Sequence, residues 1–346
     1  MERDLQLDIY RGLTMIYIVC FIHVVYWLHI GSEPFISLIL FEMPVIFFIA
    51  GAAQSLGKKK KTLGAIVWSR LKRVVFPFYV YAAVSLVIIA ILTLVWKIYY
   101  PYILSTFGEN VANKYSYDIL AYEWKDIWNV ILCKDISQAP ILWHTWFVVP
   151  YFILSCLFWF QEKAASVTGR GGYLIICIVI FFIAWAIIPQ IKLIALYNVF
   201  YISGYLFYQK IHKKFIILAA SVFLMLMFYF YVDKSIIICP MQFHKVQGDY
   251  VFLVYGLLSL SLLSLLLGSI KLKANWVLNL WNERGYTIYL YQNWIYFLFF
   301  PVFLKYIAGW NSSLLQIAAC GFCVFIMSTL LSYITYRFEK LVIGKI

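Results

Sequence analysis

Residues 7–29, LDIYRGLTMIYIVCFIHVVYWLH, decide the fold class of this chain. The stretch is predominantly apolar, and a helix of about 20 such residues crosses the hydrocarbon core of a bilayer. The same character extends along the chain, because 64% of its 346 residues are hydrophobic, whereas a soluble domain is closer to half apolar. We therefore expect an all-α, polytopic membrane helix bundle that forms a single domain over residues 1–346.

Ten apolar segments are long enough, or nearly long enough, to cross the membrane. Two of them, residues 173–190 and 193–208, are short and are separated by Pro189. They could be two spans or one bent re-entrant element. The ten segments are residues 9–29, 36–56, 74–96, 142–161, 173–190, 193–208, 215–232, 250–270, 285–304 and 313–336.

The distribution of Lys and Arg predicts the orientation of these segments. With the N-terminus inside, most of the 28 basic residues fall in cytoplasmic segments, as the positive-inside rule requires. Both termini are then cytoplasmic, and the net charge of +13 reflects topology rather than binding to nucleic acid. We expect a multi-pass protein of the bacterial plasma membrane, in contact with its lipids.

One long segment, residues 97–141, falls outside the membrane on the extracytoplasmic side in this orientation. Its part AYEWKDIWNVI, residues 121–131, mixes aromatic and charged residues and could form a helix on the membrane surface. The segment could cover an acceptor site or be a plain connector, and the sequence leaves both interpretations open.

An ionisable residue inside a membrane is costly and is therefore a functional hypothesis. His23 lies in the first apolar segment and Glu42 in the second, at similar predicted depths because a short loop joins the two segments. The Glu42 carboxylate could fix the tautomer of the imidazole and raise its basicity, which would make His23 a catalytic group. The alternative is that the two residues only satisfy each other.

Basic residues at the cytoplasmic ends of helices predict a site for an anionic ligand. Arg11 opens the first apolar segment, where Asp8 could pair with it. Arg70 and Arg73 lie one helical turn apart before the third segment, and paired guanidinium groups bind phosphates well. We expect these three arginines to hold the phosphates of a donor such as coenzyme A. An arginine at a membrane edge can also be a plain interfacial anchor, and Lys58 to Lys61 are typical of a positive-inside loop.

Three further residues are candidates for binding the acceptor: His144, Trp146 and Asn293. His144 and Trp146 begin the fourth apolar segment at the outer face, where they could equally pack at the membrane interface. Asn293 lies within the ninth segment, where amides often bridge helices. No residue spacing typical of a metal site occurs, so we expect no metal.

Six stretches occur in a particular order: LDIYRGLTMIYIVCFIH at the start, FEMPVIFFIAG, RLKRVVFPFY, WHTWFVVPYFI, GYTIYLYQNW, and YRFEKLV at the end. In this order the chain resembles the acyltransferase-3 family of integral membrane acyltransferases. The resemblance implies about ten helices that transfer an acyl group, usually acetyl from acetyl-CoA, to a hydroxyl of a cell-envelope glycan or a related acceptor. It also implies that Arg11 and His23 are essential.

The chain departs from the family pattern at two points. The family usually has ten residues between this arginine and histidine, whereas eleven separate Arg11 from His23. In a regular α-helix the extra residue turns the pair about 120° apart, whereas one step fewer brings them within about 20° of the same face. Either a π-bulge absorbs the extra residue, or the two residues address different regions. In addition, family members often carry a histidine where Gln292 or Asn293 stands.

These observations lead us to expect a membrane O-acyltransferase that takes acetyl-CoA from the cytoplasm. His23 would act as general base on an acceptor hydroxyl or carry the acetyl group as an acyl-imidazole, with Glu42 orienting it. Three alternatives remain open at this point. The chain could export or flip a lipid-linked glycan, transfer succinyl rather than acetyl groups, or recruit an acceptor for a separate enzyme.

Overall fold

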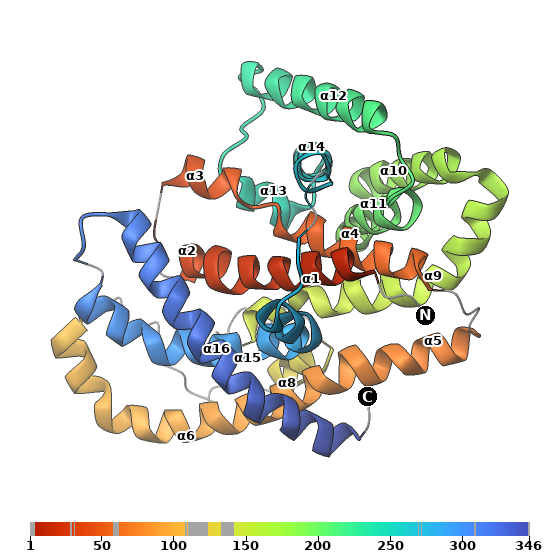
Figure 1. Cartoon of the computed structure of the whole chain (residues 1–346). Helices are drawn as coiled ribbons and strands as arrows, with labels where there is room; N and C mark the ends of the chain where they lie inside the picture. Colours follow the sequence, from red (N-terminus) through yellow and green to blue (C-terminus); the bar gives the residue numbers. More distant parts are fainter. Residues whose placement is uncertain are drawn as a thin grey trace. The chain divides into compact units, whose positions relative to one another are not determined.

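The computed structural model describes residues 4–27, 30, 32–57, 62–107, 109, 124–132, 142–268, 270, 272–307 and 309–344. Every regular element within these residues is a helix, which confirms the predicted all-α class (Figure 1). The basic run Lys58 to Lys61 and most of the predicted loop at 97–141 lie outside the described residues.

Seven helical segments in the described part of the chain are long and apolar enough to cross a membrane, so the protein is a multi-pass membrane protein. The other predicted spans also fall on helices: α9 (Val148–Thr168), α11 (Lys192–Phe207) and α15 (Trp276–Tyr306). Whether these three cross the membrane stays a prediction. The seven segments are Leu5–Tyr26, Glu33–Ser55, Leu63–Ile88, Arg170–Ile187, Lys213–Val232, Tyr250–Leu267 and Ser313–Ile343.

Two compact units make up the chain, and each combines segments that are far apart in the sequence. The first unit comprises residues 1–66 and 153–285, and the second comprises residues 67–152 and 286–346. In the first unit the helices besides α11 are α1 (Leu5–Tyr17), α2 (His23–Trp27), α3 (Glu33–Leu38), α4 (Glu42–Ser55), α10 (Arg170–Ile187), α12 (Lys213–Val232), α13 (Met241–Gln247) and α14 (Tyr250–Leu267), with much of α9 and the start of α15. The second unit contains α6 (Phe76–Phe107), α8 (Trp124–Ile131), α16 (Ser313–Ile343) and the rest of α15, and α5 (Leu63–Arg70) ends in it.

A close helix crossing in the first unit joins α4 to α11 through two glycines. A Cβ atom built on Gly51 would lie 1.8 Å from the carbonyl oxygen of Tyr201, and one on Gly204 would lie 1.9 Å from that of Phe48. No side chain fits at either position, so the two backbones touch directly. Small residues allow this kind of approach between membrane helices, where van der Waals packing is a main source of association.

The segment predicted as one span at 36–56 is broken in the structure. Helix α3 ends at Leu38 and α4 begins at Glu42. Pro44 explains the break, because proline has no N–H to donate and its ring clashes with the carbonyl group four residues earlier, here that of Leu40. The carbonyl groups left free are still satisfied: Tyr17 donates to Ile39, and Tyr255 donates to Leu38 at 2.9 Å.

One further boundary differs from the prediction, and two predicted features are present. Helix α6 continues to Phe107 rather than ending at residue 96, because the aromatic and aliphatic run from Trp96 to Phe107 contains no strong helix-ending signal other than Pro101. The predicted surface helix within 121–131 is present as α8, although its position on a membrane surface stays a prediction. Residues 173–190 and 193–208 form two separate helices, α10 and α11.

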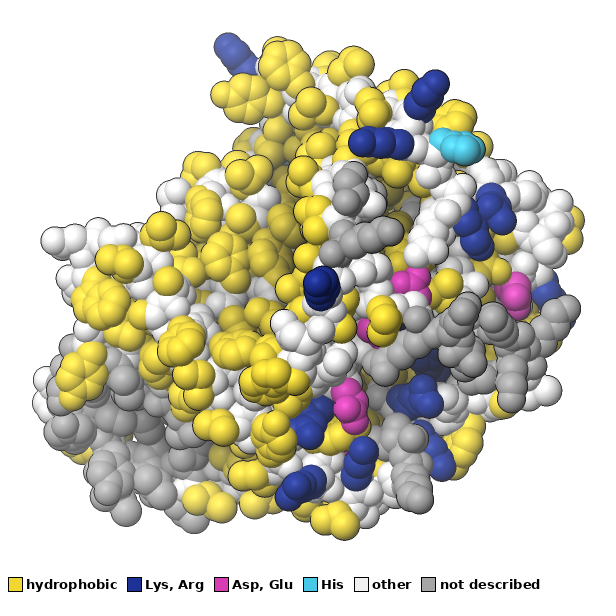
Figure 2. All heavy atoms as spheres, in the orientation of Figure 1, with side chains coloured by type: hydrophobic (Ala, Val, Ile, Leu, Met, Phe, Trp, Pro, Cys, Tyr) yellow, Lys and Arg dark blue, Asp and Glu magenta, His cyan; other side chains and the backbone are white. Residues whose placement is uncertain are grey.

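Helix α12 presents most of its apolar surface outward. Only 11% of its most apolar window is buried, and its exposed side chains include Phe228, Tyr231 and Leu218. Figure 2 shows hydrophobic side chains over this helix and basic side chains at both of its ends. An apolar helix with charged ends suits contact with lipid tails and flanking headgroups.

Candidate active site

The side chain of Arg11 is held by polar groups of the first unit. Its Nη1 donates to Oδ1 of Asn282 at 3.2 Å and lies 3.6 Å from the Asp8 carboxylate, which confirms the predicted pair with Asp8. Gly12 allows α15 to approach at this point, because a Cβ there would lie 2.7 Å from the carbonyl oxygen of Leu278. Sequence reasoning did not find Asn282, which is 271 residues from Arg11.

A π-helical turn lies between Arg11 and His23, over Ile18–Ile22. A π-turn holds one more residue than an α-helical turn does, so it absorbs the extra residue that the sequence places between the two side chains. Arg11 and His23 then return to within about 20° of one face. Of the two predicted alternatives, the structure shows the π-bulge. His23 is the first residue of α2 and is partly buried.

Glu42 is the first residue of α4 and is only 2% exposed. Its Oε1 accepts a hydrogen bond from Nζ of Lys245, on α13, in an ion pair. Its Oε2 is buried and has no hydrogen-bond partner among the described residues. The N-terminus of α4 favours the negative charge at this position. The predicted pairing of Glu42 with His23 stays a prediction, and sequence reasoning did not find Lys245.

Three tyrosine side chains lie within electrostatic range of the Glu42 carboxylate. It interacts electrostatically with the phenol groups of Tyr17, Tyr26 and Tyr255. The hydroxyl groups of Tyr17 and Tyr255 donate to backbone carbonyls at the break between α3 and α4. The buried Tyr26 hydroxyl has no hydrogen-bond partner within the described ranges. Among the described residues, a buried carboxylate oxygen and a buried phenol therefore both have no partner, which is costly for buried polar groups.

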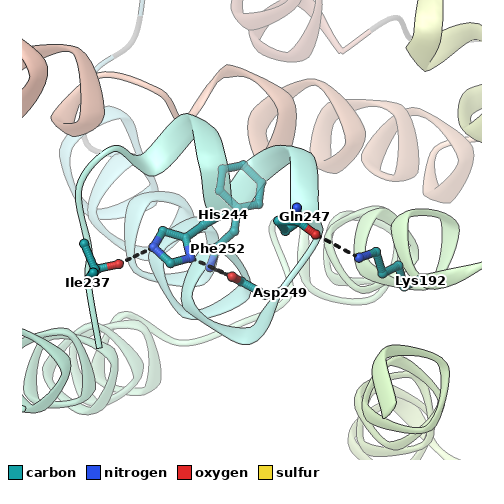
Figure 3. Close-up of polar contacts among 6 residues, drawn as sticks. All are labelled: Lys192, Ile237, His244, Gln247, Asp249 and Phe252. Carbon is teal, nitrogen blue, oxygen red and sulfur yellow. Dashed lines mark hydrogen bonds and ion pairs between the residues drawn. The ribbon is translucent and has the colours of Figure 1, made fainter. Parts of the chain in front are cut away.

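Helix α13, which carries Lys245, is held by a histidine clamp (Figure 3). In this clamp His244 binds Ile237, which precedes the helix, and Asp249, which follows it. Nδ1 of His244 lies 2.6 Å from Oδ2 of Asp249, and Nε2 faces the carbonyl oxygen of Ile237. Both partners are acceptors, so both ring nitrogens donate when the imidazole is charged. Burial acts to lower the pKa of His244, but the hydrogen bond and charge of Asp249 and the Ile237 carbonyl outweigh it, so the pKa is raised.

Other contacts fix α13 to the first unit. The backbone N–H of Met241 donates to Oγ of Ser37 at 2.8 Å, and Nζ of Lys192 lies 3.4 Å from Oε1 of Gln247. Asp249 also caps α14, because its Oδ1 accepts from the backbone N–H of Phe252 at 3.1 Å. The segment that presents Lys245 to Glu42 is thus anchored at several points rather than by the ion pair alone.

The second unit contains the two other predicted donor-binding arginines. Arg70 ends α5, and Arg73 lies in a second π-helical turn, Leu71–Val75. Arg73 is exposed and Arg70 is partly buried. Within the described ranges neither forms an ion pair. Their binding of donor phosphates stays a prediction.

The structure brings together two of the residues predicted to bind the acceptor. His144 and Asn293 are each 1% exposed, and Nδ2 of Asn293 lies 2.7 Å from Nδ1 of His144. Nε2 of His144 faces the carbonyl oxygens of Tyr289 and Leu290 at 3.0 and 3.1 Å. An amide donor at Nδ1 and carbonyls at Nε2 select the neutral imidazole with its proton on Nε2. The expectation that Asn293 bridges helices is confirmed.

The third of these residues, Trp146, lies in the 3₁₀ helix Trp143–Phe147 and is partly buried. The same turn is tied to α15 by Tyr289, whose hydroxyl donates to the carbonyl oxygen of His144 at 2.9 Å. The predicted role of His144, Trp146 and Asn293 in acceptor binding stays a prediction.

Comparison with known proteins gives one match. Residues 4–337 match a family model described as an acyltransferase domain, which covers nearly the whole chain. No match was found among curated proteins or among solved structures.

Proposed function

The chain belongs to the acyltransferase-3 family, and we propose that this acyltransferase moves an acetyl group from acetyl-CoA to a hydroxyl of a cell-surface or lipid-linked glycan. The observation that best supports the proposal is the placement of Arg11 and His23 on one helical stretch with a π-turn between them. Twelve residues apart, the two side chains are separated by roughly 18 Å along the axis. That separation suits phosphate binding at one end and acyl transfer at the other.

In the proposed reaction His23 takes the proton of the acceptor hydroxyl as its oxygen attacks the thioester carbonyl carbon. A C–O bond forms, the C–S bond breaks, and the thiolate of coenzyme A leaves and takes up a proton. If His23 carries the acetyl group instead, its neutral ring nitrogen attacks the thioester carbon, the C–S bond breaks, and coenzyme A leaves as the thiol with the imidazole proton. The acceptor hydroxyl then attacks the acyl-imidazole, the C–N bond breaks, and the hydroxyl proton passes by way of Glu42 to the released imidazole. In both routes Glu42 acts together with His23.

The donor would be held by cationic groups. Arg11, Arg70 and Arg73 would bind the phosphates of acetyl-CoA from the cytoplasmic side, because guanidinium groups bind phosphate oxygens in a bidentate manner. Asn282 supports this role for Arg11, because it fixes the direction of the guanidinium group. The protein would work in a bacterial plasma membrane with His144, Trp146 and Asn293 at the acceptor.

A transfer assay tests this function. Membranes containing the protein are incubated with acetyl-CoA labelled in the acetyl group, and extracted envelope glycans are analysed for alkali-labile label. His23→Ala should abolish the label, whereas His212→Ala, which changes an exposed histidine before α12, should retain it. Glycan movement across the membrane with no dependence on acetyl-CoA would contradict the proposal and favour a transporter. Label transfer from succinyl-CoA alone would replace acetyl by succinyl.

A further inference from the structure

The ion pair between Lys245 and Glu42 joins two helices of the first unit, α13 and α4. The two residues are 203 positions apart, and they are 12% and 2% exposed. Among the described residues, the charged and titratable groups that interact with the Glu42 carboxylate include Lys245 from α13, Tyr17 and Tyr26 from the first helical stretch, and Tyr255 from α14. Lys245 is the cation of this set, so it is the group that compensates the carboxylate charge.

A carboxylate as buried as Glu42 requires such compensation. Without a nearby cation, a buried carboxyl group takes up a proton rather than remain charged. The N-terminus of α4 contributes in the same direction, but a helix terminus supplies only about half an elementary charge. Lys245 is the described cation that forms an ion pair with the Glu42 carboxylate.

Only one carboxylate oxygen is used by Lys245. Oε1 accepts from the ammonium group, and Oε2 is left buried without a partner within the described part of the chain. The Tyr26 hydroxyl, on which Glu42 acts electrostatically, is also buried without a hydrogen-bond partner among the described residues. A hydroxyl group from a ligand can donate to a carboxylate oxygen and accept from a phenol, so the pair matches the chemistry of an alcohol.

We propose that Lys245 is a positioning residue that keeps Glu42 charged and directs its free oxygen, Oε2, to the hydroxyl group of the acceptor. The inference rests on the proposed acyl transfer and deepens it, because it assigns a binding site for the acceptor hydroxyl. In this site the hydroxyl is bound away from water, donates to Oε2 of Glu42 and faces the Tyr26 hydroxyl. The site suits the acyl-imidazole route, because in the other route the single hydrogen of the hydroxyl goes to His23.

The first test is the pH profile of acetyl transfer to envelope glycan in membranes. Lys245→Met keeps most of the side-chain volume but removes the charge. It should displace the acid limb of the profile to higher pH by about 1–3 units, which is about a 10- to 1000-fold loss of rate on that limb. Lys245→Arg should restore the profile, and Lys192→Met, which removes an exposed lysine that also contacts α13, should leave it in place.

The second test does not depend on activity. In infrared difference spectra against the unaltered protein at neutral pH, Lys245→Met should show an additional carbonyl stretch of a protonated carboxyl group. The band should disappear in the double variant with Glu42→Gln and be absent from Lys245→Arg, which would exclude a general effect of misfolding. Absence of the band in Lys245→Met would overturn the charge control.

The two tests separate the possible failures. A protonated band together with an unchanged pH profile would overturn the role of Glu42 at the acceptor. If the unaltered protein transferred no acetyl group at all, the proposed function would fail, and the infrared result alone would still decide whether Lys245 sets the charge of Glu42.

Discussion

Substituting Gly204 by alanine should destabilise the first unit because it forces α4 and α11 apart. The new Cβ atom would lie 1.9 Å from the carbonyl oxygen of Phe48, whereas an ordinary contact is 3.4 Å or more. The helices must therefore separate locally by the difference of 3.4 − 1.9 = 1.5 Å. A displacement of this size loses a large part of the dispersion energy along the crossing. We expect a cost of about 3 kcal/mol, at the upper end for overpacking.

The assay is equilibrium unfolding in mixed detergent micelles, with Gly171→Ala as the matched control. Gly171 lies in α10, and no atom lies within 4 Å of a Cβ built there. The control should be neutral or stabilising by up to about 1 kcal/mol, because alanine favours a helix over glycine. Gly204→Ala should also impair acyl transfer, because α4 carries Glu42. Equal stability of the two variants would refute direct backbone contact between α4 and α11.

Three further predictions concern the site and its surroundings. Asn282→Ala should raise the Kd of acetyl-CoA about fivefold. The substitution removes the hydrogen bond that orients the 37% exposed Arg11, which contributes about 1 kcal/mol to the free energy of binding. An unchanged Kd in calorimetric titration would contradict that role. Arg73→Ala should mainly raise the acetyl-CoA KM, and a KM equal to that of the unaltered protein would count against phosphate binding. The pKa of His244 is raised in the folded protein above its ordinary value of 6.5, so its clamp with Asp249 should stabilise the protein fully below that pH. This stabilisation should fade as the pH rises through the folded-state pKa, and His244→Gln should remove this part of the pH dependence of the unfolding midpoint.

Much of the helix arrangement follows from local patterns. Apolar length places the membrane helices, and the count of eleven residues between Arg11 and His23 pointed to a π-bulge as one of two alternatives. The break between α3 and α4 was missed, although Pro44 carries its signal. One proline hardly changes the mean hydropathy of an apolar segment, so the segment was predicted as one span. The loss of one backbone hydrogen bond at Pro44 is a local effect, and it determines where α4 begins.

The polar partners could not be predicted in the same way. Lys245 and Asn282 lie more than 200 residues from Glu42 and Arg11, and nothing in the local sequence relates the two members of either pair. His144 and Asn293 were both identified as site residues, but their hydrogen bond depends on how α15 packs within the second unit. The cost of polar residues in a membrane identified the site residues from the sequence. Their partners depend on tertiary packing and could not be predicted.

The measurement that tests the central claim most directly is release of free thiol from acetyl-CoA by the purified protein in lipid nanodiscs, with His23→Ala beside it. The account predicts that the unaltered protein binds acetyl-CoA and releases coenzyme A, and that His23→Ala remains folded and inserted but releases none beyond the background. Equal thiol release by the two proteins would contradict the role of His23. Folded protein that neither binds nor cleaves acetyl-CoA would contradict the proposed donor.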